Sequence, residues 1–309
     1  HLAGEADVDA AVAAARAALD GAWGKTGGTE RSRLLHALAD AIAANRNELV
    51  ELEARNVGKA ISSVKAEVGG AVECFRFYAS AIGTIGGRSN AMGASLLTYS
   101  LKEPVGVAAQ IVPWNYPLLM AVWKLAPALA AGCPVVLKTD PQTPATALRI
   151  AQLAAEVGLP KGAINVISAD GPTVGAYLVR HPGVDKVAFT GSTRSGIAVM
   201  QAAAESVKRV TLELGGKSPN LIFADADLSS AVPSSAWAVF YACGQSCEAR
   251  SRLLVEKAIY DDVVNALADA AKRIKQGDPL EADTQIGSLI SLTHRERVAG
   301  FVDRAKAAG

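Results

Sequence analysis

Apolar residues recur every three or four positions through the first 80 residues of the chain. The stretches "DVDAAVAAARAALDGAW" and "TERSRLLHALADAIAANRNELVELEARNVGKA" place them at i, i+3 and i+4, which predicts amphipathic helices. Asp7 and Thr29 are expected as N-caps, and Gly58 as a stop. Residues 81–104 then change to the glycine-rich "GTIGGRSNAMGAS" and the alternating "LLTYSLKEP". That pattern is typical of a hairpin or an exposed strand.

From residue 105 onward, short β-branched runs alternate with helical patterns. The candidate strands are "VGVAAQIVP", "PVVLKT", "AINVIS", "KVAFTG", "RVTLEL" and "NLIFA". Strands separated by helices need crossover connections, so they predict a largely parallel sheet that is covered on both faces. Such a sheet binds ligands in the crevice beyond the carboxyl ends of its strands.

Composition narrows the class of protein. Half of the 309 residues are apolar, and 31 Lys and Arg oppose 30 Asp and Glu, so no general attraction to nucleic acid or anionic lipid is expected. The apolar runs are broken well before the roughly 20 residues that a membrane span needs. We therefore expect neither nucleic acid nor a membrane as partner. Four cysteines in so long a chain fit a reducing compartment, and we expect a cytoplasmic protein.

Two predicted strand ends carry groups that could bind a nucleotide. Gly191 and Ser192 stand where "KVAFTG" leads into a helix, and backbone amides at a helix start can bind a pyrophosphate. The alternative is a tight turn that needs glycine, because the spacing is neither that of a P-loop nor G-x-G-x-x-G. Lys138, at the end of "PVVLK", could contact a phosphate or a ribose. Its alternative is a surface lysine.

Two other strand ends carry groups suited to catalysis. Asn115, held between Pro113 and Pro117, is either a rigidly placed amide donor or a turn asparagine. Glu213 lies in the apolar strand end "TLEL". A carboxyl group in apolar surroundings has a raised pKa and suits general base work. The alternative is a structural glutamate that binds a backbone amide.

The segment "YACGQSCEARSR" places Cys243 and Cys247 four residues apart. A metal site would need more ligands than this segment offers, and so short a disulfide loop is disfavoured, so we predict no metal. If the preceding helix runs to Ala242, Cys243 is buried at its end. Cys247 then falls in a loop or at a new helix start, where the pKa of a thiol drops. From these residues alone, a nucleophile and a pair of packed thiols both remain open.

Taken in order along the chain, these segments resemble the aldehyde dehydrogenase superfamily. Four of its signature regions match, "EPVGVAAQIVPWNYPLLMAVWKLAPALAAGCPVVLK", "VAFTGS", "LELGGKSPNLIF" and "GQSC". The resemblance implies an α/β fold with a variant Rossmann cofactor domain, an α/β catalytic domain that is incomplete here and a β-hairpin oligomerisation arm. The implied ranges are 1–85 for the helical part of the cofactor-binding domain, 86–104 for the hairpin, 105–215 for the Rossmann-like part and 216–309 for the N-terminal part of the catalytic domain.

The resemblance also implies the NAD(P)-dependent oxidation of an aldehyde to a carboxylic acid. The Cys247 thiolate would attack the aldehyde, and the oxyanion would lie near the Asn115 amide and the Cys247 backbone N–H. After hydride leaves to the nicotinamide, water deprotonated by Glu213 would hydrolyse the thioester. Relatives that pass the acyl group to coenzyme A lack a base at this position, so Glu213 favours hydrolysis.

The remaining implied residues bind the cofactor or line the aldehyde tunnel. The cofactor-binding residues are Lys138, Pro113, Trp114, Gly191, Ser192 and Leu214. The tunnel residues are Tyr116, Met120 and Trp123, for which ordinary packing is an equal alternative. The implied partners are a small-molecule aldehyde and further copies of the chain, in a homodimer or homotetramer.

Three departures from the family pattern bear on function. Pro141 stands where many relatives have a glutamate that binds the adenosine ribose and repels a 2′-phosphate, so the cofactor is NAD or NADP, with NAD slightly preferred. Glu248 and Arg250 follow the nucleophile, and Arg250 stands where glycine is common. The later E-x-F-G-P motif is absent. Since the chain also begins at His1 and stops at Gly309 within a helical pattern, we expect it to be part of a longer one.

Two other functions are compatible with the sequence. A non-catalytic nucleotide-binding or structural protein would keep the scaffold without turnover. A dehydrogenase that forms an acyl-CoA would need coenzyme A and would not depend on Glu213 for release of the acyl group.

Overall fold

The computed structural model describes residues 2–93 and 95–309, and the chain divides into two compact units. Unit 1 consists of His1–Leu49 and Glu67–Glu213, and unit 2 of Val50–Ala66 and Leu214–Gly309. The division after Glu213 lies close to the boundary at residue 215 that the sequence predicts, although the functional names of the domains remain predictions. His1 and Ala94, the latter within the predicted hairpin, lie outside the described residues.

A parallel sheet forms the centre of unit 1. Its strands are β3 (Ala108–Ile111), β4 (Val135–Thr139), β5 (Ile164–Ser168), β6 (Lys186–Gly191) and β7 (Arg209–Leu214). Within the described residues the order is β5-β4-β3-β6-β7, and Ala108 of β3 pairs in parallel with both Val135 and Lys186. From β3 the chain adds β4 and then β5 on one side, and it then crosses over to add β6 and β7 on the other side. This order is that of a Rossmann-like α/β sheet, and the predicted fold class is confirmed.

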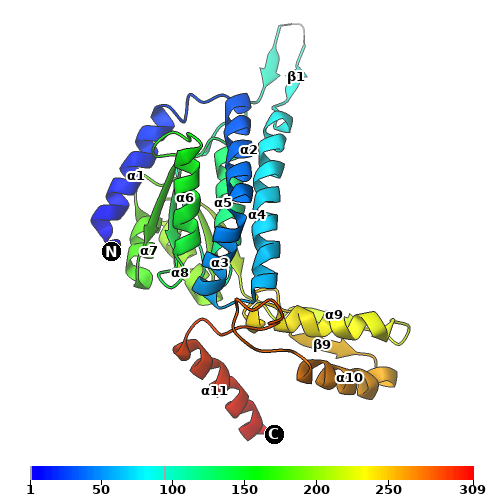
Figure 1. The fold of residues 1–309 in the computed structure, drawn as a ribbon. Helices are drawn as coiled ribbons and strands as arrows, with labels where there is room; N and C mark the ends of the chain where they lie inside the picture. The colour runs from blue at the N-terminus through cyan, green and yellow to red at the C-terminus, as the bar shows by residue number, and fades with distance from the viewer. Residues whose placement is uncertain (1, 94) are drawn as a thin grey trace. The chain divides into compact units, whose positions relative to one another are not determined.

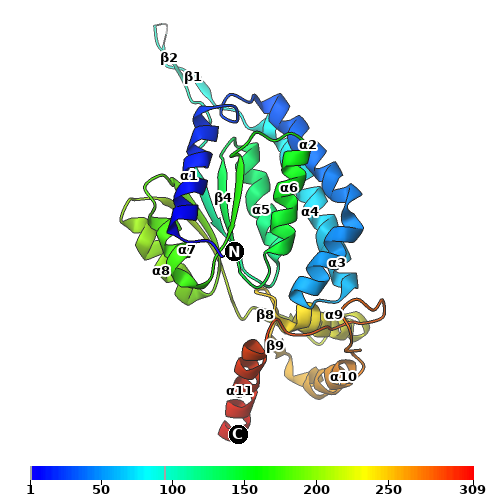
Figure 2. The ribbon, with the colours of Figure 1, turned by 60° about the vertical axis from the view of Figure 1, so that its left-hand side comes forward.

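Helices cover both faces of this sheet (Figures 1 and 2). One face carries α5 (Pro117–Ala130) and α6 (Ala145–Glu156), with α2 (Gly28–Ala44) packed outside them. The other face carries α1 (Glu5–Asp20), α7 (Gly171–Arg180) and α8 (Thr193–Ala204). Strands β3 and β4 are buried at every position, as expected of central strands covered on both faces, whereas β7 alternates between exposed and half-buried positions at the edge.

Asp185 fastens helix α1 to the starts of the central strands. Its Oδ2 accepts hydrogen bonds from Arg16 Nη2 at 2.5 Å and from the Val107 backbone N–H at 2.7 Å. Gly106 has a φ of +115°, and a Cβ there would lie 1.9 Å from the same carboxylate oxygen. Glycine is therefore required for the loop before β3 to approach Asp185 this closely.

The N-terminal helices begin earlier than the sequence predicts. Helix α1 follows Gly4, and the Asp7 carboxylate in its first turn accepts a hydrogen bond from the Gly4 N–H at 2.9 Å. Helix α2 follows Gly27, which places Thr29 inside the first turn. Both predicted N-caps are wrong, because glycine can take the extended N-cap conformation without a capping side chain. Gly58 is confirmed as a stop: it has a φ of +83° directly after α3 (Arg46–Val57).

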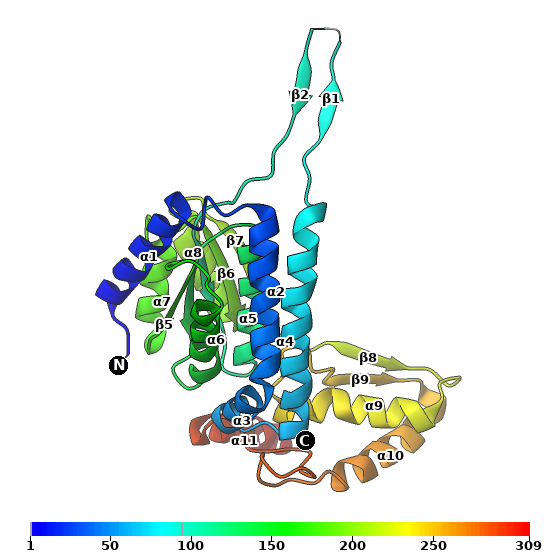
Figure 3. The ribbon, with the colours of Figure 1, turned by 45° about the horizontal axis from the view of Figure 1, so that its top comes forward.

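A hairpin projects from unit 1, as Figures 1 and 3 show. It follows α4 (Ile61–Ala81) and the short helix η1 (Ile82–Thr84), and its strands are β1 (Ser89–Ala91) and β2 (Leu97–Tyr99). The two strands pair antiparallel, with Ser89 opposite Tyr99. Leu97, Tyr99 and Leu101 are exposed, so the hairpin carries an uncovered set of large apolar side chains.

Unit 2 contains a smaller α/β arrangement (Figure 3). Besides the end of α3 and the start of α4, it contains β8 (Pro219–Ile222), α9 (Leu228–Phe240), η2 (Tyr241–Gly244), β9 (Arg252–Val255), η3 (Lys257–Ile259), α10 (Tyr260–Lys272) and α11 (Leu292–Ala308). Strands β8 and β9 pair in parallel, and α10 packs along α9. Asn220 of β8 donates to Ser235 Oγ of α9 at 2.8 Å. In the described part of the chain, every helix is too short or too polar to cross a bilayer.

Val207 occupies a strained position in the turn after α8. Its φ is +53°, and its side chain is 90% exposed. The Val207 N–H donates to the Ala204 carbonyl and the Lys208 N–H to the Ala203 carbonyl, both at 3.2 Å. These two bonds form a Schellman motif, whose left-handed residue is usually glycine. A β-branched residue is poorly suited to this conformation.

We expect Val207→Gly to stabilise the protein by roughly 0.5–1 kcal/mol in urea unfolding, because relief of about 1–2 kcal/mol of left-handed strain exceeds the added backbone entropy of glycine. The control is Val264→Gly, at an exposed position inside α10, which should destabilise by about 1 kcal/mol. A destabilised Val207→Gly variant would contradict the strain assigned to this turn.

Candidate active site

Several residues of unit 1 that were predicted to bind the cofactor, and Asn115, predicted to stabilise the oxyanion, lie at the carboxyl edge of its sheet. Pro113, Trp114 and Asn115 follow β3, Lys138 is near the end of β4, and Gly191 ends β6. The register aligns Ile111 of β3 with both Lys138 and Phe189, so these strand ends are neighbours. Because the strand order reverses on either side of β3, this edge is the switch point at which open α/β sheets bind ligands.

The loop after β6 starts a helix, as the sequence predicts. Ser192 is the N-cap of α8, and its Oγ accepts a hydrogen bond from the Ser195 N–H at 3.1 Å. A Cβ at Gly191 would lie 2.6 Å from the Phe189 ring, so glycine is needed here for packing. Packing against Phe189 is thus one reason for glycine at this position, and the choice between a tight turn and anion binding is not decided by it. The anion-binding interpretation depends on the start of α8 and remains a prediction.

Lys138 is buried, which contradicts the alternative of a surface lysine. Its Nζ donates to the backbone carbonyls of Ala169 at 2.9 Å and Thr139 at 3.1 Å. Burial lowers the pKa of this ammonium group, while the carboxylates of Asp140 and Asp170 oppose that shift. An ammonium group has three donors, so one N–H remains for a ligand.

A groove of about 430 Å³ runs between α7 and α8 and includes Lys138 in its lining. Its apolar walls include Ile111, Pro172, Ala176, Val179, Phe189 and Val199. Its charged lining residues are Lys138, Arg180 and Arg194. Prediction from sequence missed the part that α7 contributes. The available signal was the pair of glycines four residues apart, Gly171 and Gly175, which share a helix face and leave space beside it.

The predicted tunnel residues belong to the first turns of α5. Tyr116, its N-cap residue, and Met120 are buried, whereas Trp123 is 54% exposed. Asn115 is half-buried directly before this helix. Spacings of four and three residues place the three tunnel positions on one helical face. Packing explains the two buried residues as well as a tunnel does, and the exposed Trp123 is the one that packing does not explain.

Lys124 is a further polar group that prediction from sequence missed. It is buried in α5, and its Nζ donates to Thr190 Oγ1 of β6 at 2.5 Å. Burial lowers its pKa to about 8, and the Glu213 carboxylate of β7 opposes this shift. The Gln110 side chain of β3 donates to the Lys124 carbonyl at 2.8 Å. The signal in the sequence was a single charged residue in the apolar run "LLMAVWKLAPALAAG".

Glu213 does not have the apolar surroundings that its strand suggested. Its side chain is exposed on β7, and Leu214, the last residue of that strand, is half-buried. The edge position of β7 explains the difference, since alternate residues of an edge strand face outward. Glu213 is accessible to water, and Lys124 supplies a positive charge near it.

In unit 2, the two cysteines lie in different environments. Helix α9 ends at Phe240, two residues before the predicted end, and is followed by three left-handed residues, Ala242, Cys243 and Gly244. Cys243 is half-buried, and burial raises the pKa of its thiol. Cys247 is exposed. The accessible thiol is therefore the one that the sequence assigns as nucleophile.

Gln245 holds the cysteine loop in place. Its side chain is buried, its Oε1 accepts from the Ile290 N–H at 3.0 Å, and its Nε2 donates to the Ala242 carbonyl at 3.4 Å. These bonds tie the left-handed turn to the segment before α11. They hold the chain two residues before Cys247 to the backbone of the same unit. Among the described residues, no cluster of three or more His, Cys, Asp or Glu is arranged to hold a metal ion.

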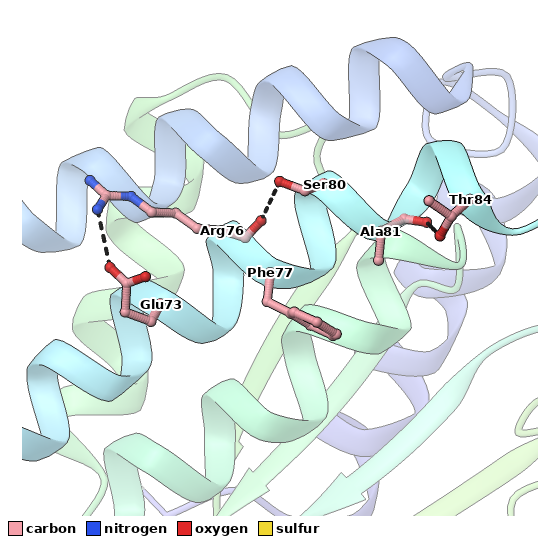
Figure 4. A pocket seen from close by; sticks show the side chains of 6 residues that line it. All are labelled: Glu73, Arg76, Phe77, Ser80, Ala81 and Thr84. Atoms are coloured by element: carbon pink, nitrogen blue, oxygen red, sulfur yellow. Dashed lines mark hydrogen bonds and ion pairs between the residues drawn. The ribbon is translucent and has the colours of Figure 1, made fainter.

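A separate hollow of about 540 Å³ lies on the outer face of α4 and η1 (Figure 4). Phe77 points into it, and Arg76 forms an ion pair with Glu73 at 3.2 Å. Its other lining residues are Ser80, Ala81 and Thr84. It contains none of the predicted site residues, so we do not assign the chemistry to it.

Comparison with known proteins identifies relatives of the whole chain. The model of the aldehyde dehydrogenase family matches residues 1–309. The chain is 46% identical over 310 residues to an aldehyde dehydrogenase of Emericella nidulans, covering 100% of this chain and 62% of that protein. It is 43% identical over 309 residues to aldehyde dehydrogenase 1A1 of Mesocricetus auratus, covering 99% of this chain and 62% of that one.

The fold is likewise similar to that of solved structures. An NAD⁺ complex of an aldehyde dehydrogenase from Bacillus cereus superposes with a TM-score of 0.97 at 43% identity, covering 100% of this chain and 63% of that one. The chain therefore spans a little under two thirds of the length of the relatives it matches.

Replacing Lys124 tests the cost of its buried charge. Its pKa is about 8 in the folded protein, below the ordinary lysine value of 10.5, so the unfolded chain binds more protons between these pH values. Stability should therefore rise with pH across this window, and below pH 8 the full cost of burying the ammonium group is present.

We expect Lys124→Met to stabilise the protein at pH 7 by about 1–3 kcal/mol. The gain comes from removing the buried charge, and it is reduced by the loss of the hydrogen bond to Thr190. The rise in stability between pH 8 and 10 should shrink. Urea unfolding across this range measures both effects, with the exposed Lys25→Met as control. An unchanged pH dependence would show that Lys124 is not the titrating group.

Proposed function

Because the chain belongs to the aldehyde dehydrogenase family, we propose that it acts in the NAD(P)-dependent oxidation of an aldehyde to a carboxylic acid. The observation that carries this proposal is the switch-point edge of the unit 1 sheet, where Lys138 near the end of β4, Asn115 after β3 and the start of α8 after β6 lie at neighbouring strand ends. The substrate class is a small-molecule aldehyde. Tyr116, Met120 and Trp123 of the α5 face are the residues we assign to its tunnel.

The groove between α7 and α8 is suited to the adenosine part of a dinucleotide. Its apolar walls can enclose a flat base, and the remaining Lys138 donor can reach a ribose or phosphate oxygen. The start of α8 at Gly191 and Ser192 offers backbone N–H groups to a pyrophosphate. We assign Pro113, Trp114 and Leu214 to the rest of the cofactor site. When bound, NAD(P) supplies the acceptor for the hydride that leaves the aldehyde carbon.

Cys247 is the nucleophile in this proposal. Its thiolate sulfur forms a bond to the aldehyde carbon, and the carbonyl oxygen takes up the negative charge. The Asn115 amide and the Cys247 backbone N–H donate hydrogen bonds to that oxygen. After loss of hydride from the same carbon, the acyl group remains on the sulfur as a thioester. The exposure of Cys247, against the half-buried Cys243, supports this assignment.

Glu213 is the base that completes the reaction. Its carboxylate accepts a proton from water, whose oxygen attacks the thioester carbon and releases the acid and the Cys247 thiolate. The exposure of Glu213 leaves it accessible to that water. Lys124, whose pKa is lowered to about 8, supplies a nearby positive charge that changes near neutral pH. These features support hydrolysis over transfer to coenzyme A.

Assembly and location are also part of the proposal. The exposed Leu97, Tyr99 and Leu101 on the hairpin are suited to burial against another copy of the chain, in a homodimer or homotetramer. All four cysteines are free thiols, which supports a reducing compartment and hence the cytoplasm.

Substitution of the proposed nucleophile and base separates their roles. NAD(P)H formation at 340 nm, measured with each cofactor and a panel of aldehydes, should fall by at least about 10³-fold in Cys247→Ala. Glu213→Gln should slow steady-state turnover by about 10²–10⁴-fold and leave a first burst of NADH, since only acyl release needs the base. Cys243→Ala is the matched cysteine control and should keep its activity.

Three results would contradict these roles. Turnover that survives Cys247→Ala would remove this residue as nucleophile. Turnover that requires coenzyme A and is unaffected by Glu213→Gln would favour acyl transfer. Nucleotide binding without turnover of any aldehyde would favour a non-catalytic protein.

A further inference from the structure

The groove between α7 and α8 carries an excess of positive charge. Its lining residues include Lys138, Arg180 and Arg194 and no carboxylate. Arg180 is balanced by an ion pair with Glu205 at 3.2 Å. The charge that remains available to a ligand is therefore that of Lys138 and Arg194.

Arg194 lines the groove from an exposed position at the start of α8. Among the residues that the structure describes, it takes part in no ion pair or hydrogen bond. It is the second residue of α8, where the helix dipole makes a cation unfavourable by about 0.3–1 kcal/mol. An anion bound in the groove would offset this cost, and it would accept hydrogen bonds from two N–H groups of the guanidinium group at once.

Lys138 presents a second donor to the same groove. Two of its three N–H groups bind backbone carbonyls, and its burial disfavours the charged form. The opposing carboxylates nearby are already engaged: Asp170 accepts from the Gly171 N–H at 2.7 Å, and Asp140 from the Gln142 N–H at 3.0 Å. Neither of them lines the groove. A doubly charged phosphate would therefore meet two cations there and no lining carboxylate.

We propose that Arg194 and Lys138 bind a phosphate on the adenosine ribose, so that the groove selects NADP over NAD. This inference rests on the proposed nucleotide site. The pyrophosphate is assigned to the backbone at the start of α8, and the base to the apolar walls. The ribose connects the base to the pyrophosphate. Its hydroxyl positions are therefore the part of the nucleotide that faces Arg194 and Lys138. A phosphate is favoured over a hydroxyl because an arginine binds two phosphate oxygens at once.

Two probes with equal numbers of phosphates test the proposal without turnover. Isothermal titration calorimetry on the full chain compares 2′,5′-ADP, which carries a ribose phosphate, with 5′-ADP, which carries a diphosphate. We expect 2′,5′-ADP to bind at least tenfold more tightly. Arg194→Gln should weaken its binding about 10- to 100-fold and change 5′-ADP binding less than threefold, as expected for loss of a charge-assisted hydrogen bond.

Arg180→Gln is the matched control. This arginine lines the same groove, but Glu205 already balances its charge, so its loss should change binding of 2′,5′-ADP less than threefold. Circular dichroism of each variant confirms that the fold is intact before the comparison is made.

The outcomes separate this inference from the proposed function. Equal binding of the two probes, with no effect of Arg194→Gln, would overturn the ribose-phosphate assignment and leave the nucleotide site intact. A larger loss of 5′-ADP binding in Arg194→Gln would place the guanidinium group on the pyrophosphate and also overturn it. Failure of the wild-type chain to bind either probe would remove the nucleotide site itself, and the inference with it.

Discussion

The parallel pairing of β3 with both β4 and β6 is the constraint on which the rest of unit 1 depends. It requires the crossover helices that bury β3 and β4 on both faces, and it aligns the carboxyl ends of three strands at one edge. Loops that leave this edge in opposite directions open a crevice between them. Lys138, Asn115 and Gly191 are far apart in sequence and become neighbours only through this register. Asp185 secures the opposite edge, where it ties α1 to the starts of the strands.

Much of this architecture could be predicted from the sequence, because short β-branched runs and helical periodicity report burial directly. The strand-end residues follow from the same pattern. Asp7 and Thr29 show where it fails: glycine serves as N-cap at both helices, and no side chain marks such a start. The prediction that Glu213 has apolar surroundings fails because of the tertiary structure. A strand that reads as apolar is exposed on alternate residues when it lies at the edge of a sheet, and sequence alone did not give the strand order.

Prediction from the sequence missed Lys124 and Arg194 as site residues, because their roles depend on tertiary neighbours rather than on the local sequence. Both are single cations in helices, and the sequence does not say that one is buried against Thr190 while the other lines a groove. Burial is costly for a charge and partial neutralisation lowers that cost. Lys124 has its hydrogen bond to Thr190 and the carboxylate of Glu213, and so retains a pKa of about 8 despite its burial.

The two cysteines illustrate how backbone conformation can decide chemistry. Three left-handed residues in succession are costly for Ala242 and Cys243, which carry a Cβ, and such strain persists only where surrounding contacts hold it. The buried Gln245 side chain supplies those contacts through Ile290 and Ala242. The turn leaves Cys243 half-buried, where burial raises the pKa of its thiol, and the chain emerges with Cys247 exposed. A regular helix through this segment would place two residues four apart on one face and give both thiols a similar environment, so the turn is what makes them different.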